Sequence, residues 1–433
     1  WNVSFQRELP WGLVMQAAYV GRRGEHLFMA YDINQINPGP IIPSFLVMRQ
    51  NRRNGCTALG TGCPAGVTGV APALFSQLVN AFIAAGQSSL TATTSATNFI
   101  NSTTTQGELD INNVGNFANR IEDNVLGLKL RPNQQFGVIT YLDNSGDSNY
   151  NALQLTLRRR FASGLGLSMA YTYGKSIDNQ SVDPVGASSG GGLSTTNSRT
   201  PVDDRDWSIE RGRSDFDRTQ VFQAASVWEL PVGRGRHFLR SSHGVVNQVL
   251  GGWTVNSIFL FMTGEPFSVR SSSRTANGAH ESRAVLRDPN VRPVLHELPG
   301  QTFAGPVLFD PSSGLPCDLV VGTNQQFCIP DPGQNGMGRN VFTAPHYWNL
   351  DLGIVKGFQI NERFRLQFRT ELFNALNHPN FDNPRDASVG SPAIRSSVFA
   401  QVCCATVAPP QTQTIVQTGE SARIIQFALK LQF

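Results

Sequence analysis

The last thirteen residues, 421–433, read SARIIQFALKLQF and carry the clearest indication of the fold class. Every second residue counted back from the end is apolar, and the residues between them are mostly polar or small. The apolar set is Ile425, Phe427, Leu429, Leu431 and Phe433. A period of two predicts a β-strand with one apolar face. The ends of soluble domains are usually solvated and frayed, so a strand that ends on Phe433 is atypical of them.

The same alternation recurs along the chain and predicts roughly nine confident strands. Residues 151–161 (NALQLTLRRRF) and 164–175 (GLGLSMAYTYGK) form the clearest pair, joined by a short turn in which Gly164 can adopt a positive φ. These strands are about ten residues long, which is the length that crosses a bilayer at a tilt. The other strong segments are 1–8, 12–21, 219–230, 251–264, 347–356 and 363–375.

The connections between the predicted strands alternate between short and long. The short or medium ones are 9–12, 162–164, 231–252 and 356–362, and the long ones are 21–150, 175–217, 264–346 and 375–422. A transmembrane β-barrel has tight turns at one rim and long loops at the other, whereas a soluble sandwich has no reason to sort its loops in this way. We therefore expect an all-β fold, an antiparallel transmembrane β-barrel with short periplasmic turns. Residues 21–150 would be a long extracellular loop region.

Composition excludes several other classes of protein. The 433 residues carry 35 Lys+Arg against 31 Asp+Glu, and a net charge of +4 does not suggest nucleic-acid binding. No apolar run approaches the length of a transmembrane helix. Residues 1–12 (WNVSFQRELPWG) lack the basic and apolar regions of a signal peptide and read as the middle of a strand, so we expect a fragment.

Five segments carry a resemblance to a known family. Residues 150–178, 214–235, 252–269, 338–384 and 423–433 are similar to the barrel of TonB-dependent receptors of the Oar-like type. The resemblance covers most strands after residue 150 and the opening hairpin, and it is weak in the loops, especially over 40–130. It implies that this chain is the C-terminal half of a barrel of about 22 strands in the outer membrane. We expect the signal peptide and the plug domain of that family to lie outside this chain.

The resemblance also implies partners and a function. The barrel assembly machinery would read the closing strand through Phe427, Leu429, Leu431 and Phe433, and outer-membrane lipid would surround the barrel. Uptake of an unknown solute would be energised by the TonB system through a plug that this chain lacks. Strand phase predicts five charged residues that line the lumen: Arg158, Arg160, Arg365, Arg369 and Glu371.

Two other functions have to be weighed against transport. A non-transporting surface adhesin or structural barrel would use the long loops as its working part, and a plug and TonB box encoded upstream would argue against it. A soluble secreted β-rich protein, such as a glycosidase, fails because its apolar ladders would form large exposed patches. It also lacks a positioned pair of carboxylates. We find no nucleophile–base pair and no cofactor motif, so we expect no enzyme activity.

The six cysteines all fall in predicted long loops. An even number of cysteines, all on the long-loop side of the predicted barrel, suggests disulfides in an oxidising compartment. Six cysteines can pair in 15 ways. The pairing that is local in sequence joins Cys56 to Cys63 and Cys317 to Cys328. The state of Cys403 and Cys404 stays open. A zinc site would need paired CxxC spacing and nearby histidines, which the sequence does not show.

Three polar or helical segments offer weaker candidates. Residues 202–218 (VDDRDWSIERGRSDFDR) form either a cation or ligand site at the outer rim or a solvated patch of ion pairs that neutralise one another. Residues 143–149 (DNSGDSN) resemble part of a calcium loop but lack its glycine and closing glutamate, which favours an Asx-rich turn. Residues 71–86 have helical spacing and would either pack on their own loop or cover the barrel mouth. The glycine-rich run 188–193 is interpreted as a flexible loop.

Overall fold

The structure is a computed structural model of the 433-residue chain. It describes every residue except 125–127, 182–200, 301–305, 321–324, 361–362, 382, 385–391, 398 and 403–421. The glycine-rich run 188–193 and the pair Cys403 and Cys404 therefore lie outside the described residues.

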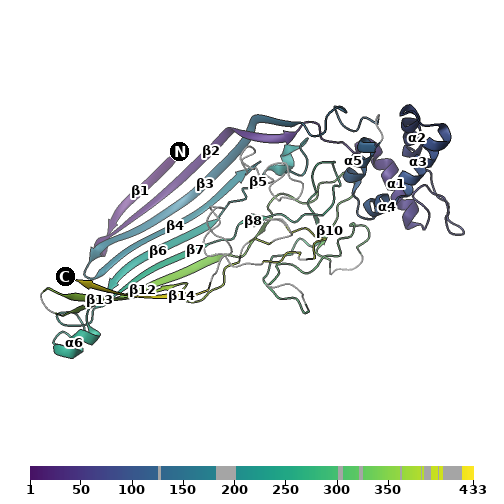
Figure 1. Ribbon diagram of the computed structural model, residues 1–433. Helices are drawn as coiled ribbons and strands as arrows, with labels where there is room; N and C mark the ends of the chain where they lie inside the picture. The colour runs from purple at the N-terminus through teal and green to yellow at the C-terminus, as the bar shows by residue number, and fades with distance from the viewer. Residues whose placement is uncertain are drawn as a thin grey trace.

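Nine long strands form one antiparallel sheet in which each strand pairs with the next long strand along the chain. Figure 1 shows these strands side by side, with β1 and β14 at the two edges. The strands are β1 (Asn2–Leu9), β2 (Leu13–Asp32), β3 (Thr140–Ala162), β4 (Leu165–Asp178), β6 (Gln220–Glu229), β7 (Trp253–Met262), β12 (Tyr347–Gln359), β13 (Arg365–Phe373) and β14 (Ile424–Gln432). A short strand, β5 (Gly212–Arg213), pairs with β4 outside this order.

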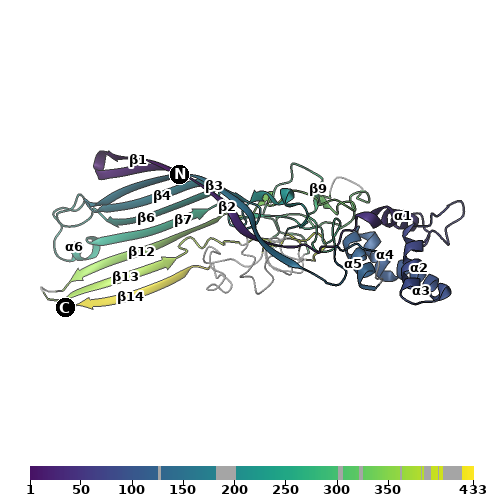
Figure 2. The same ribbon diagram turned by 90° about the horizontal axis from the view of Figure 1, so that it is seen from above.

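Short and long connections lie at opposite ends of the sheet, as the sequence predicts (Figure 2). The 3-10 turn η1 (Pro10–Gly12) joins β1 to β2, and a turn with Gly164 at φ 82° joins β3 to β4. The connection from β6 to β7 is longer and contains the short helix α6 (Gly244–Leu250). We call this end of the sheet the tight-turn end and the opposite end the loop end.

The prediction that 21–150 is a long loop within an all-β chain is wrong. Strand β2 continues to Asp32 and β3 already begins at Thr140, so both ends of this region are paired strand. Between them lie five helices: α1 (Ile42–Arg53), α2 (Leu74–Ala84), α3 (Ser89–Asn101), α4 (Thr103–Asp110) and α5 (Val114–Asn124). The helix predicted over 71–86 corresponds to α2.

The helices fold because they bury a hydrophobic core of their own, separate from the sheet. The side chains of Phe45, Met48, Leu78, Ile100 and Phe117 are all fully buried. Burial of this kind outweighs the weak helix propensity of a sequence such as SLTATTSATNFIN in α3. Each of two serines, Ser88 and Ser102, accepts a backbone hydrogen bond at the start of a helix, which is the usual N-cap arrangement.

A second core packs between the helices and the sheet, mostly within the connection from β7 to β12. It contains β8 (Pro266–Phe267), β9 (Val285–Leu286), β10 (Phe327–Cys328) and β11 (Phe342–Thr343), which form two short ladders. Buried aromatic rings dominate it, and the ring centroids of Phe309 lie 5.0 Å from those of both Phe327 and Phe342. We refer to this core together with the five helices as the outer region.

Candidate functional site

One face of the sheet is predominantly apolar. A single cross-strand row joins Leu157, Met169, Ala224, Phe259 and Leu350. At the β14 edge, the apolar side chains of the terminal strand continue this face and are largely exposed, Phe427 and Leu429 by 67% each. An exposed apolar face of this extent suits hydrocarbon and would be a liability in water.

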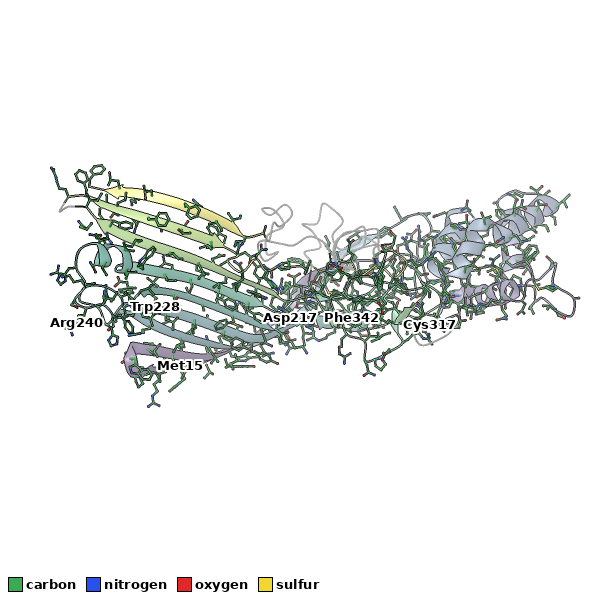
Figure 3. The ribbon with its side chains drawn as sticks, turned by 90° about the horizontal axis from the view of Figure 1, so that it is seen from below. Met15, Asp217, Trp228, Arg240, Cys317 and Phe342 are labelled. Carbon is green, nitrogen blue, oxygen red and sulfur yellow. A yellow bond between two sulfur atoms is a disulfide. The ribbon has the colours of Figure 1, made fainter. Side chains whose placement is uncertain are left out.

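Aromatic side chains mark both ends of this apolar face. Tyr171 and Trp348 lie in one row near the loop end, and Trp228 and Trp253 lie near the tight-turn end. Figure 3 shows Trp228 near that end, close to the turns. Aromatic rings in two bands are typical of the two interfaces of a membrane-spanning barrel.

The opposite face is predominantly polar. One row joins Thr156, Ala170, Gln223, Leu260 and Asn349. Strand β7 is the exception, because Leu260 and Ile258 lie on this face and make both faces of that strand apolar. We call this surface the polar face.

The five charged residues predicted from strand phase all lie on the polar face. Arg158 continues a row through Ser168, Ala225 and Ile258 to Asp351. Arg160 lies on the same face because it is two residues after Arg158 on β3. On β13, cross-strand pairing with β12 places Arg365, Arg369 and Glu371 on this face as well.

These five residues do not converge on one point. Arg158 and Arg160 belong to β3, whereas the other three belong to β13, with four long strands between them in the sheet order. The structure pairs only Arg369 with Glu371, whose charged atoms lie 3.7 Å apart. The arrangement is therefore a dispersed basic surface and not a binding pocket.

The charged segment 202–218 lies at the loop end of the sheet, where its acids are neutralised by arginines. Arg339 donates from Nη1 to Asp178 Oδ1 over 2.7 Å and from Nη2 to Asp215 Oδ1 over 3.1 Å, and its side chain is 3% exposed. Arg283 forms an equally buried ion pair with Glu210. Within the described residues no group of acids, histidines and cysteines could hold a metal ion.

The prediction of a neutralised patch is thus correct in its chemistry, but most of its acids are buried and not solvated, and Asp206 is the exception. The sequence does not predict three partners of these acids, because they lie far away along the chain. Arg283 is 73 residues from its glutamate, and His280 is 76 residues from its aspartate. Arg339 is 124 and 161 residues from its two aspartates. No local signal in the sequence marks such partners. Burial lowers the pKa of Arg283, whereas for Arg339 the nearby Asp215 and Asp178 outweigh burial and raise the pKa.

The buried network ties the outer region to the loop end of the sheet. His280 lies 3.0 Å from Asp204 Oδ2, which also accepts a hydrogen bond from the backbone of Asp32 at the end of β2. Arg218, just before β6, pairs with Glu265 over 2.8 Å. The outer region is therefore held in a fixed position on the sheet by buried polar contacts.

The calcium-loop resemblance of 143–149 has no structural counterpart. These residues belong to β3, opposite irregularities in the register of β2. Asp143 accepts hydrogen bonds from the backbone N–H and the hydroxyl of Ser145, and Tyr31 also donates to it. The local bonds of an Asx turn are present, but they lie within a strand.

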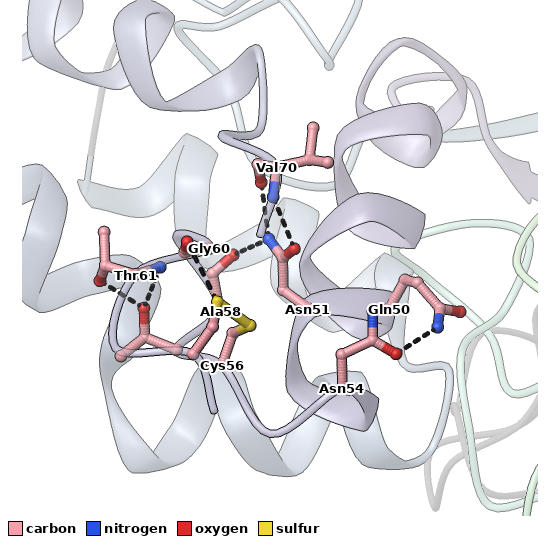
Figure 4. Close-up of a disulfide and its surroundings, with 10 residues drawn as sticks. Gln50, Asn51, Asn54, Cys56, Ala58, Gly60, Thr61 and Val70 are labelled. Carbon is pink, nitrogen blue, oxygen red and sulfur yellow. Dashed lines mark hydrogen bonds between the residues drawn. A yellow bond between two sulfur atoms is a disulfide. The ribbon is translucent and has the colours of Figure 1, made fainter. Parts of the chain in front are cut away.

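Two disulfides are present in the outer region, and each joins cysteines that are close in sequence, seven and eleven positions apart. Cys56 bonds to Cys63 and Cys317 bonds to Cys328. Figure 4 shows the first pair beside Asn51, whose amide group donates to the carbonyls of Ala58 and Val70. Disulfides are typical of compartments that are oxidising.

An ion pair joins the helices to the second disulfide. Arg53 of α1 donates to both carboxylate oxygens of Asp318, at 2.5 and 3.0 Å, and Arg49 lies 3.2 Å from the same carboxylate. The hydrogen bond from Arg53 holds the pKa of Asp318 below its usual value. The helices and the second core therefore make direct contact.

Among the described helices, none is long and apolar enough to cross a membrane.

Comparison with known proteins gives one family and one solved structure. The family model for the outer membrane beta barrel domain matches residues 1–426. No curated protein matches the chain. The outer membrane transporter YddB from Escherichia coli is similar in structure, with a TM-score of 0.34 and 7% identity. That similarity covers 93% of this chain and 30% of YddB, so this chain spans less than a third of the transporter's length. The chain belongs to the outer membrane beta barrel domain family, and its location is the outer membrane.

Proposed function

We propose that this chain forms barrel wall and outer loops of a TonB-dependent receptor of the Oar-like type, which takes up a solute across the outer membrane. The observation that carries the proposal is the two-faced meander of nine strands. One face is apolar and bounded by aromatic rings, and the other is polar and basic. A barrel wall separates lipid from an aqueous lumen in this way.

The open edges of the sheet support a larger barrel. Strands β1 and β14 are the outermost strands of the described sheet, and neither has a second neighbour there. Unpaired backbone groups within hydrocarbon are very costly, so further strands must cover both edges in the membrane. The Oar-like resemblance implies about 22 strands in total. In this proposal the assembly machinery recognises β14, and the TonB system acts through a plug domain.

The charges on the polar face suggest the class of solute. Arg158, Arg160, Arg365 and Arg369 are exposed on this face in two pairs, on β3 and β13. Its acids are spread over four strands, as Glu8, Glu229, Asp351 and Glu371, so the positive charge is concentrated in two places. A basic lumen concentrates anions and raises their rate of entry. We therefore propose that the lumen favours anionic solutes.

Neutralising the basic surface should change ion selectivity. The measurement is the ratio of anion to cation permeability of the plug-free barrel in planar bilayers. In the double variant Arg158→Gln/Arg160→Gln, this ratio should fall by at least about half. The matched control is Arg159→Gln, because Arg159 alternates onto the apolar face and pairs with Leu13 and Leu167. An equal loss in the control would contradict the assignment of the polar face to the lumen.

A surface adhesin or structural barrel is the second candidate. The folded outer region favours the adhesin or structural barrel, because a region with two hydrophobic cores and two disulfides could present a stable binding surface. Uptake in a host that lacks TonB separates the two functions. A transporter should lose accumulation of its solute in that host, whereas surface attachment by an adhesin should be unaffected.

A further inference from the structure

The connection between β6 and β7 differs from the other connections at the tight-turn end. It spans residues 231–252 and carries Arg234, Arg236 and Arg240, and no acidic residue occurs between Glu229 and Glu265. It also contains helix α6, in which no residue is buried. We call residues 231–252 the basic rim segment.

The basic rim segment exposes a cluster of apolar side chains. Val245 is 77% exposed, and five others are between 46% and 56% exposed: Phe238, Leu239, Val246, Val249 and Leu250. None of them belongs to either hydrophobic core of the outer region. Contiguous exposed apolar side chains rimmed by polar ones mark a surface that contacts a membrane or another protein.

The segment is fixed beside the apolar face of the sheet. The indole N–H of Trp253 donates to the backbone carbonyl of Val249 over 2.8 Å. Lys356 pairs with Trp253 across the strands, and its ammonium group donates to the carbonyl of Gly251. The same ammonium lies 5.1 Å from the ring of Phe358. Helix α6 is therefore held where the lipid-facing surface ends (Figures 1 and 2).

The exposed arginines of the basic rim segment indicate what kind of surface it contacts. Arg234 and Arg240 are exposed, and no ion pair joins either of them to another described residue. Arg236 is different, since it pairs with Glu229 over 2.7 Å. Figure 3 shows Arg240 at the extreme tight-turn end. Basic side chains beside exposed apolar ones are typical of segments that lie in a membrane interface and attract anionic lipids.

We propose that the basic rim segment is an interfacial anchor that binds anionic phospholipid headgroups in the periplasmic leaflet of the outer membrane. Val245 and Val249 would enter the acyl boundary, while Arg234 and Arg240 contact the phosphates. The proposal rests on the outer-membrane location and on the periplasmic side of the tight turns. It does not depend on transport, so failure of the transport proposal leaves it intact.

Lipid contact can be measured at single positions in the whole protein. Val249→Cys, in a background where Cys403 and Cys404 are serine, is labelled with an environment-sensitive fluorophore. The protein is then reconstituted in vesicles of phosphatidylcholine, with or without phosphatidylglycerol, that contain a shallow spin-labelled lipid. The control is Leu90→Cys, because Leu90 is apolar and 81% exposed but lies on α3 in the outer region.

Quenching by spin-labelled lipid at position 249 should be at least about twofold that at position 90, and it should increase with phosphatidylglycerol. Arg234→Gln/Arg240→Gln should remove that increase, whereas Arg236→Gln should remove less of it because Arg236 already has a partner. All of these side chains are exposed, so the variants should fold. Quenching at position 249 that is no greater than at position 90, or that does not respond to phosphatidylglycerol, would overturn the proposal.

Discussion

Replacing Arg339 with alanine should destabilise the outer region by about 3–5 kcal/mol. The guanidinium of Arg339 bonds to Asp178 and Asp215, and it also donates to the backbone carbonyl of Glu210 over 3.2 Å. Removing it would leave buried carboxylates without their cation, which is the costly half of a broken buried ion pair. The loss should appear as a lower urea midpoint for proteolysis of the outer region in the folded, membrane-inserted protein.

The matched control for this prediction is Arg211→Ala. Arg211 pairs with Asp147, but both side chains are more than 40% exposed. An exposed ion pair contributes at most about 1 kcal/mol, so the midpoint should move little. Equal shifts in the two variants would show that the Arg339 network is not what holds the outer region to the sheet.

Placing an arginine on the apolar face should destabilise the barrel by about 2–4 kcal/mol near the bilayer midplane. Leu350 lies between the two aromatic bands of the apolar face, one row from the band of Tyr171 and Trp348, so the cost there should be at the lower end of this range. The control is Asn349→Arg, one residue earlier on the polar face, where the new guanidinium would lie near Asp351. Residues 349 and 350 are both half-buried, so the comparison isolates the face on which the charge lies.

Stability can be followed by the temperature at which the folded band is lost on unboiled gels. Leu350→Arg should lower this temperature clearly, and Asn349→Arg should lower it little. The reverse order would mean that the faces are assigned the wrong way round, since a register error of one residue exchanges them.

The sheet could be predicted from the sequence because its determinants are local. Alternation in residues 151–161 and 363–375 sets the face of each side chain without knowledge of any distant partner. Short or medium connections join half of the neighbouring pairs, and the pairs across the long connections follow from the up-and-down order of an antiparallel barrel. The disulfides from Cys56 to Cys63 and from Cys317 to Cys328 were also predictable, because seven and eleven residues separate the partners.

Apart from α2 and the two disulfides, the outer region could not be predicted, because its determinants are distant. Helices α3 and α4 are rich in Ser and Thr, and they form because they share a core with α1 and α5. The partners of Arg339 lie 124 and 161 residues away, and Arg283 pairs with a glutamate 73 residues away. Such contacts depend on how the connections pack at the loop end of the sheet. Composition and periodicity carry no information about that packing.

The measurement that most directly tests the membrane-barrel assignment uses the full-length gene product in a Gram-negative host. The outer-membrane fraction is isolated, and the mobility of the protein on detergent gels is compared with and without boiling. We expect a band in that fraction that shifts on heating, because a closed barrel resists detergent until it is heated. A protein that is soluble, or that shows no shift, would contradict the account. The exposed apolar face would then have to pack against another protein surface.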